Sequence, residues 1–291
     1  MHLLYLIFGN HYHNYLQAYA SISSFKTNCK ELKTINIITD HPVWFEAIKS
    51  DINIIPLSAE QLREWKGEHN YFWRAKIKAI ETLSKMYKNE PIVYLDTDTF
   101  LYNDKSKIAD TLSQNKALMH LNEGAIKNDS SKTVKKMHRQ ITVLSGSPVE
   151  NLADYDMWNA GVVASPNTKD SQEFELALSV CDFLCENKVT DRLLEQFSLS
   201  VALKHTYGLE ESSDCIAHYW SNKDEWNQYW NELFLSNIFR GSDLTQFVSE
   251  FDKQDFSKMP PILKISKNTK KRLIKWVEKK FPDKEVVYLK G

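Results

Sequence analysis

Two carboxylates, separated by one residue, follow directly on a short apolar run. Residues 92–95 read Ile-Val-Tyr-Leu, and Asp96, Thr97 and Asp98 come next. A buried carboxylate is costly unless a cation or strong donors compensate it, and two neighbouring carboxylates also repel each other. Their oxygens suit Mg²⁺ or Mn²⁺, ions that complete their shell with water and substrate phosphates. The pair therefore predicts a divalent-metal site for a diphosphate-bearing substrate, the alternative being one Asp that caps a turn beside a solvated one.

The elements that must position this pair alternate along the first hundred residues. Short apolar runs predict strands, and stretches with helical spacing separate them. The predicted strands are Leu3 to Phe8, Lys33 to Thr39, Asp51 to Pro56 and the run from Ile92, and the first predicted helix is Tyr15 to Phe25. Such alternation indicates an α/β fold with a mostly parallel central sheet flanked by helices. Ligands of such sheets gather at the carboxyl ends of the strands, where Gly9, Asn10 and Asp40 join the carboxylate pair.

The helix predicted just before the carboxylates carries both an apolar and a basic face. Its apolar side is formed by Trp73, Ile77, Ile80 and Leu83. Arg74 and Lys78 are four residues apart, so they share another face. We expect these two cations to reach a bound diphosphate or to stabilise Asp96 and Asp98.

Composition excludes several classes of protein. The net charge is -1 and the pI is near 6.8, so we expect no nucleic-acid partner. No GxGxxG or GxxxxGK[ST] string follows the first strand, which argues against a dinucleotide-binding Rossmann domain and a P-loop NTPase. The apolar run near the N-terminus is too short for a signal peptide and no segment suits a membrane span, so a cytoplasmic location is predicted. Cys181 and Cys185 lie one helical turn apart and are predicted to be buried helix residues rather than a metal pair.

The second half of the chain contains a polar stretch and then further ordered elements. Residues 122–136 read as a mobile loop over the site. Order returns at residues 157–165, and helices are predicted over residues 172–186 and 191–205. Residues 251–261 have the character of a linker, and a basic amphipathic helix follows. We therefore divide the chain into a catalytic domain, residues 1–240, and a C-terminal linker and helix, residues 241–291.

Taken in order, these motifs carry a resemblance to a known family. The strand with its carboxylate pair (residues 92–101), "MWNAGVVAS" (157–165), "LLEQFSLS" (193–200) and "AHYWSNKDEW" (217–226) follow one another along the chain. This arrangement resembles the nucleotide-sugar glycosyltransferases of the A-type fold (GT-A), particularly the group related to glycogenin and the bacterial lipooligosaccharide galactosyltransferases. The resemblance spans roughly residues 1–230 and implies transfer of a sugar from a nucleoside diphosphate, with UDP as the nucleotide.

The resemblance implies a role for each matching residue. Asp96 and Asp98 correspond to the metal-binding DxD motif, and His218 to a third ligand of Mn²⁺ or Mg²⁺. The first strand-to-helix turn and the end of the second strand correspond to the nucleotide site. The nucleotide-binding residues are then Phe8, Gly9, Asn10, Tyr12, Asp40 and Thr97, with Arg74 and Lys78 as the cations added from the helix.

Asn159, Ala160 and Gly161 match a string that approaches the donor sugar or the acceptor, although Gly161 at the entry of a strand can also simply relieve crowding. Glu195 and Gln196 match the pair beneath the transferred sugar, where relatives more often have Asp-Gln. If the reaction inverts the anomer, a base such as Asp156, Asp191 or Glu195 must deprotonate the acceptor hydroxyl. The resemblance implies retention, in which the leaving diphosphate can take that proton.

Three other functions share part of this pattern. A haloacid dehalogenase-type phosphatase also places DxD after a strand, but near the N-terminus and with Thr or Val where Phe100 stands. A sugar-nucleotide pyrophosphorylase needs a glycine-rich basic loop, which the turn after Phe8 does not resemble. A non-catalytic nucleotide-sugar binding protein is the remaining alternative, and donor hydrolysis separates it from an enzyme.

The basic C-terminal helix predicts one of two contacts. Its apolar residues are Leu273, Ile274, Trp276, Val277 and Phe281, set among lysines and an arginine. We expect the apolar face to pack on the catalytic domain. The alternative is peripheral contact with an anionic membrane at its inner face, which would suit a lipid-linked or lipopolysaccharide-type acceptor.

Overall fold

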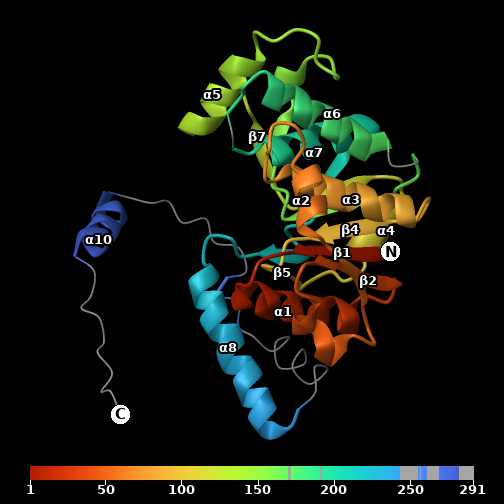
Figure 1. The fold of residues 1–291 in the computed structure, drawn as a ribbon, viewed down its shortest axis with the longest axis vertical. Helices are drawn as coiled ribbons and strands as arrows, with labels where there is room; N and C mark the ends of the chain where they lie inside the picture. Colours follow the sequence, from red (N-terminus) through yellow and green to blue (C-terminus); the bar gives the residue numbers. More distant parts are fainter. Residues whose placement is uncertain (170–171, 191, 243–254, 256, 261–268, 282–291) are drawn as a thin grey trace.

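The computed structural model describes the chain except for residues 170–171, 191, 243–254, 256, 261–268 and 282–291. Its centre is a seven-stranded sheet with the order β10-β6-β9-β4-β1-β2-β3. Figure 1 shows β4, β1 and β2 next to one another in this sheet. These strands are β1 (His2–Ile7), β2 (Thr34–Thr39), β3 (Asn53–Pro56), β4 (Ile92–Leu95), β6 (Ala117–Met119), β9 (Val162–Ser165) and β10 (Leu209–Glu211). Neighbouring strands run parallel except at β9, which is antiparallel to both β4 and β6. The predicted mostly parallel α/β sheet is confirmed.

Helices cover both faces of the sheet because its strands carry apolar side chains on both faces. In β1, Leu3, Tyr5 and Ile7 enter one core and Leu4 enters the other. The first core is closed by α1 (Tyr12–Asn28) and α4 (Lys107–Ser113). The second is closed by α2 (Ala59–Trp65), α3 (Arg74–Met86), α6 (Gln172–Glu186) and α7 (Leu194–Thr206). On α6, Cys181 is buried and Cys185 half-buried, and neither forms a disulfide.

Two shorter strand pairs adjoin the central sheet. β5 (Thr99–Leu101) pairs antiparallel with β11 (Ile216–His218), and His218 lies opposite Thr99. β7 (Asn122–Ala125) pairs with β8 (Asp156–Trp158), and α5 (Lys132–Ile141) follows β7. Residues 122–136 therefore contain a strand and the start of a helix, so the predicted irregular loop over the site is wrong.

Aromatic packing holds the β5–β11 pair in place. Phe100 of β5 packs against Tyr219, Trp226 and Trp230, and all four side chains are fully buried. Trp226 and Trp230 belong to α8 (Lys223–Arg240), which lies beside α1 in Figure 1 and contacts it through an edge-to-face pair of Tyr19 and Phe234. This separate aromatic core therefore holds β11, which carries His218, against β5, which directly follows Asp98.

The structure changes two expectations about apolar helix faces. On α3, Ile77, Ile80 and Leu83 are fully buried, but Trp73, the residue that precedes the helix, is 50% exposed, so the apolar side predicted from Trp73 to Leu83 is buried only from Ile77 onward. On α10 (Thr269–Lys280) and just after it, the five apolar side chains named above are 43–73% exposed. They do not pack on the catalytic domain, and contact with an anionic membrane stays a prediction. Among the described residues, no helix combines the length and apolar character needed to cross a bilayer.

Because Trp226 is fully buried beneath β5 and β11, replacing it with Ala should leave a large cavity. We expect Trp226→Ala to lower the free energy of unfolding by about 3–5 kcal/mol, measured by denaturant titration. Phe239→Ala is the control on the same helix, since Phe239 is 85% exposed, and its effect should stay within about 0.5 kcal/mol. Equal effects of the two changes would show that the aromatic cluster does not support this strand pair.

Candidate metal and diphosphate site

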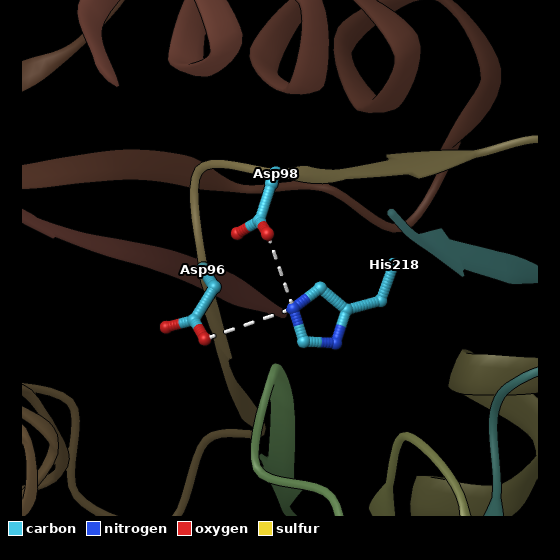
Figure 2. A group of neighbouring side chains, drawn as sticks. All are labelled: Asp96, Asp98 and His218. Atoms are coloured by element: carbon cyan, nitrogen blue, oxygen red, sulfur yellow. Dashed lines mark ion pairs between the residues drawn. The ribbon is translucent and has the colours of Figure 1, made fainter. Parts of the chain in front are cut away.

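Asp96, Asp98 and His218 converge at the carboxyl end of β4 (Figure 2). His218 Nε2 lies 3.4 Å from Asp98 Oδ2 and 4.0 Å from Asp96 Oδ2. One ligand atom from each residue lies within 4.8 Å of the other two. Asp98 and His218 are buried, and Asp96 is half-buried. Two carboxylate oxygens and one imidazole nitrogen form a suitable set of ligands for Mn²⁺ or Mg²⁺.

The tautomer of His218 is set by Asn159. The Oδ1 atom of Asn159 accepts a hydrogen bond from the backbone N–H of Gly161 at 3.0 Å and lies 2.9 Å from His218 Nδ1. An amide oxygen only accepts, so Nδ1 carries the proton and donates it to Asn159. In the neutral ring the lone pair of Nε2 then points at the two carboxylates. In that form the lone pair and the carboxylate oxygens repel one another unless a cation lies between them, which fits a metal ion. Without a metal ion, a second ring proton would make His218 a cation beside Asp98.

Gly161 provides the space for the His218 ring. A Cβ atom at this position would lie 2.2 Å from Nδ1 of His218. The carbonyl oxygen of Gly161 also accepts a hydrogen bond from the backbone N–H of Asp96 at 2.8 Å. One glycine therefore ties the first carboxylate to the chain between β8 and β9 and lets the imidazole approach it.

Asp98 is compensated by cations on one side. Its Oδ2 atom is buried and accepts no hydrogen bond of regular geometry, although Lys223 Nζ lies 2.9 Å away. Burial by itself would raise the pKa of Asp98, but His218 and Lys223 together lower that pKa below its usual value. The carboxylate is therefore held in its ionised form, which is the form that binds a metal ion.

His120 lies behind the site. Its ring meets that of His218 edge to face at a centroid distance of 5.2 Å, and its Nε2 bonds to the carbonyl oxygen of Ile216. Burial, together with the neighbouring His218, lowers the pKa of His120 to about 3. His120 is therefore neutral and adds no positive charge behind His218.

Lys76 is the functional side chain that the sequence analysis missed. It is 5% exposed, and its Nζ lies 3.0 Å from Asp96 Oδ1, 3.2 Å from the carbonyl oxygen of Ala160 and 3.8 Å from Glu195 Oε1. Burial lowers its pKa, but Asp96 and Glu195 more than offset this and raise the pKa above the usual value. The phenol of Tyr94 donates a hydrogen bond to the same oxygen of Asp96 at 2.8 Å. Lys76 is thus a buried cation between the DxD motif and α7.

Glu195 and Gln196 open α7 on the far side of Lys76. Both are 8% exposed. Tyr71 donates a hydrogen bond to Glu195 at 3.4 Å, and the amide of Gln196 donates one to Glu123 at 3.1 Å. Burial raises the pKa of Glu195 above its usual value, and Lys76 offsets only part of this effect.

Two cavities meet at this cluster. The first, of about 330 Å³, contains Phe8, Thr97, Asp98 and Lys223 in its lining, and the second, of about 370 Å³, contains the strap of residues 159–161 with Glu195, Gln196 and His218. Trp73, Lys76 and Asp96 line both. Asp96 and Lys76 thus lie where the two cavities join. A ligand that fills both cavities would therefore contact the DxD motif.

Only part of the predicted nucleotide site lines the first cavity. Phe8 and Thr97 do, and Thr97 also donates a hydrogen bond to Gln17 of α1 at 3.0 Å. The backbone N–H of Gly9 bonds to both carboxylate oxygens of Asp40 at 3.1 Å, so these two residues form one turn outside the lining. Asn10 follows in the same turn and Tyr12 begins α1, and both side chains are exposed.

The structure places Arg74 and Lys78 elsewhere. Arg74 makes a bidentate ion pair with Asp182, at 2.6 and 2.9 Å, and Lys78 pairs with Glu81. Neither lines the cavities at the DxD motif, so the expectation that they face a diphosphate is wrong in this structure, and Lys76 takes that position. Of the remaining candidate bases, Asp156 lines a different cavity and Asp191 lies outside the described residues.

The comparisons with known proteins agree with this fold. No protein-family model matches the sequence, and no curated protein matches it. Among solved structures, the galactosyltransferase LgtC, solved in complex with donor and acceptor sugar analogues, is similar with a TM-score of 0.54 at 13% identity, over 80% of this chain and 94% of LgtC. The glycosyltransferase GlyE of Streptococcus pneumoniae TIGR4 is similar with a TM-score of 0.50 at 14% identity, over 91% of this chain and 66% of GlyE. The chain therefore has the GT-A fold that the sequence motifs predict.

A Cβ atom at Gly161 would overlap the His218 ring, so Gly161→Ala should displace this ligand. We expect Mn²⁺ affinity, measured from free Mn²⁺ by electron paramagnetic resonance, to fall about 10- to 100-fold, as for other changes that move a metal ligand.

The control is a double-mutant cycle with His218→Ala. If Gly161→Ala acts only by displacing the imidazole, then adding it to His218→Ala should lower Mn²⁺ affinity by less than a further factor of about two. A full, additive loss in that background would show that Gly161 acts on the site by another route.

Proposed function

We propose that this protein is a metal-dependent glycosyltransferase that moves a hexosyl group from a UDP-sugar to a hydroxyl of a glycan or lipid-linked acceptor. The observation that carries this proposal is the convergence of Asp96, Asp98 and His218 at the junction of two cavities. A diphosphate lies naturally beside such a metal site, with the nucleoside on one side and the sugar on the other. The GT-A fold shared with LgtC and GlyE supports the same function.

The proposed donor spans both cavities, with its nucleoside in the first and its sugar in the second. In the proposal the nucleoside lies in the first cavity beside Phe8, and the diphosphate lies near Asp96, Asp98 and Lys223. The sugar extends into the second cavity, between the strap of residues 159–161 and Glu195. LgtC was solved with donor and acceptor sugar analogues, which supports a nucleotide-sugar donor and a glycan acceptor here.

In the proposed reaction, the bond between the anomeric carbon and the diphosphate oxygen breaks and leaves an oxocarbenium-like sugar. A divalent ion held by Asp96, Asp98 and His218 would supply Lewis-acid stabilisation of the leaving diphosphate. Lys223 adds a positive charge beside Asp98, and Lys76 pairs with both Asp96 and Glu195 and so fixes these carboxylates beside the proposed position of the sugar. These groups are positioned before the reaction, so they can stabilise the charge that develops in the transition state without reorganising.

The proposed reaction retains the configuration of the anomeric carbon. The acceptor hydroxyl would approach from the face that the diphosphate leaves, and its proton would pass to a diphosphate oxygen. No protein base is then required, and Glu195 faces the positive charge that develops on the sugar. Among the described residues that line the second cavity, Glu195 is the carboxylate besides Asp96, so it is the candidate base there for an inverting reaction.

The phosphatase alternative has less support. Its DxD motif uses the first Asp as a nucleophile, but here the carboxylate of Asp96 is engaged by Lys76 and Tyr94. The non-catalytic alternative shares the whole site with an enzyme, so only turnover distinguishes the two.

Isothermal titration with UDP, with and without Mn²⁺, tests the donor site. We expect metal-dependent binding by the wild type and its loss in Asp96→Ala/Asp98→Ala. Asp214→Asn is the matched control, because Asp214 pairs with Lys107 at the surface with a 59% exposed side chain. Absence of UDP binding in the wild type, followed by absence of GDP, CMP and dTDP binding, would contradict the proposal.

Hydrolysis of UDP-hexoses tests turnover and the role of Lys76. We expect Lys76→Met to lower the rate of hydrolysis about a hundredfold, since it removes a preorganised charge from a buried site. Lys78→Met should change the rate less than about twofold, because Lys78 pairs with Glu81 away from both cavities. If the wild type binds UDP-hexoses but hydrolyses none, the protein is a binding protein, and if both variants behave alike, Lys76 has no special role.

A further inference from the structure

An exposed indole stands at the junction of the two cavities. Trp73 is 50% exposed and lines both of them. Phe72, which is 41% exposed, meets it edge to face at 5.0 Å, with an angle of 90° between the two rings. Phe72 in turn packs edge to face on Phe8 at 5.3 Å. A half-exposed indole that other rings hold in place has a fixed orientation, and its free face is available to a ligand.

Trp73 lies above Lys76 at the mouth of the site. The two residues are three apart at the start of α3, so their side chains lie on the same side of this helix. Lys76 is 5% exposed whereas Trp73 is 50% exposed, so the lysine forms the floor of the junction and the indole forms its outer wall. The transferred sugar, in contact with Lys76 and Asp96, would occupy the floor. Space beside the indole is therefore left for a second ring.

The chemistry of this wall suits a carbohydrate. A pyranose has polar edges and at least one face of C–H groups, and such a face stacks on an aromatic ring while the hydroxyls remain free to form hydrogen bonds. Polar groups for these hydroxyls are close by in the second cavity, which includes Arg192, Glu195 and Gln196. A site with one aromatic wall and a few convergent polar groups is typical of sugar recognition.

We propose that Trp73 is the stacking platform for the acceptor sugar, a neutral hexopyranose whose C–H face lies on the indole and whose attacking hydroxyl points toward Asp96. This inference rests on the proposed function. It assigns to Trp73 the preference for a pyranose over water as the acceptor. Trp73 lines both cavities, but UDP is bound mainly by the metal site and the other residues of the first cavity.

The test separates acceptor binding from donor binding. The full chain is saturated with UDP and Mg²⁺, and saturation-transfer NMR is recorded with methyl α- and β-glycosides of glucose and galactose and with lactose. Wild type, Trp73→Phe and Trp73→Ala are compared, with Phe239→Ala as control because Phe239 is exposed and outside both cavities. UDP affinity of each variant is measured by isothermal titration in the same buffer.

We expect at least one hexoside to bind the wild type through its C–H face, Trp73→Phe to retain most of this binding, and Trp73→Ala to weaken it about tenfold. UDP affinity should fall less than about twofold in either Trp73 variant, because Trp73 forms only part of the lining of the first cavity. Equal hexoside binding by Trp73→Ala, or no hexoside binding by a wild type that binds UDP, would overturn the role of Trp73 and leave the proposed function standing. A wild type that does not bind UDP would contradict the proposed function, and this inference with it.

Discussion

The site depends on the pairing of β5 with β11. This short antiparallel pair brings His218 opposite Thr99, the residue directly after Asp98, although the two partners are far apart in the sequence. The buried aromatic cluster of Phe100, Trp226 and Trp230 supports the pair from below, and Gly161 leaves room for the imidazole above it. A shift of one residue in this register would turn His218 to the opposite face.

The charges of the site are arranged in two groups that share Asp96. On one side, Asp98 and His218 stand beside Lys223, and on the other, Lys76 lies between Asp96 and Glu195. A buried charge is tolerated only when it is paired, so each cation and carboxylate depends on its neighbours. In the proposed complex, the same groups that compensate one another in the free protein would surround a diphosphate and a sugar.

The sequence predicted those features of the fold and the site that a local pattern of residues determines. The apolar runs predicted the parallel sheet, and Asp96 and Asp98 were recognisable because carboxylates after a buried strand need an explanation. Lys76 was missed in favour of Arg74 and Lys78, whose spacing suggested a shared basic face. Lys76 lies four residues before Ile80, on the apolar stripe of α3, and a lysine on a buried stripe next to a DxD motif was the signal that could have identified it.

Other features could not be read from the sequence because they depend on contacts between distant segments. Nothing local indicates that Asp182 of α6 would bind Arg74. Trp73 continues the apolar stripe of α3, but it stands at the N-terminal end of the helix, where the core stops and the cavities open. Helical periodicity tells which side of a helix a residue occupies and does not tell where along the helix the core ends.

The most direct test of the central claim is a crystal structure of the protein grown with UDP and Mn²⁺, with anomalous diffraction recorded at the manganese edge. The account predicts one strong anomalous peak, bound by Asp96, Asp98 and Nε2 of His218 and by oxygens of the diphosphate. A peak bound by other residues, or UDP bound away from these three side chains, would contradict it.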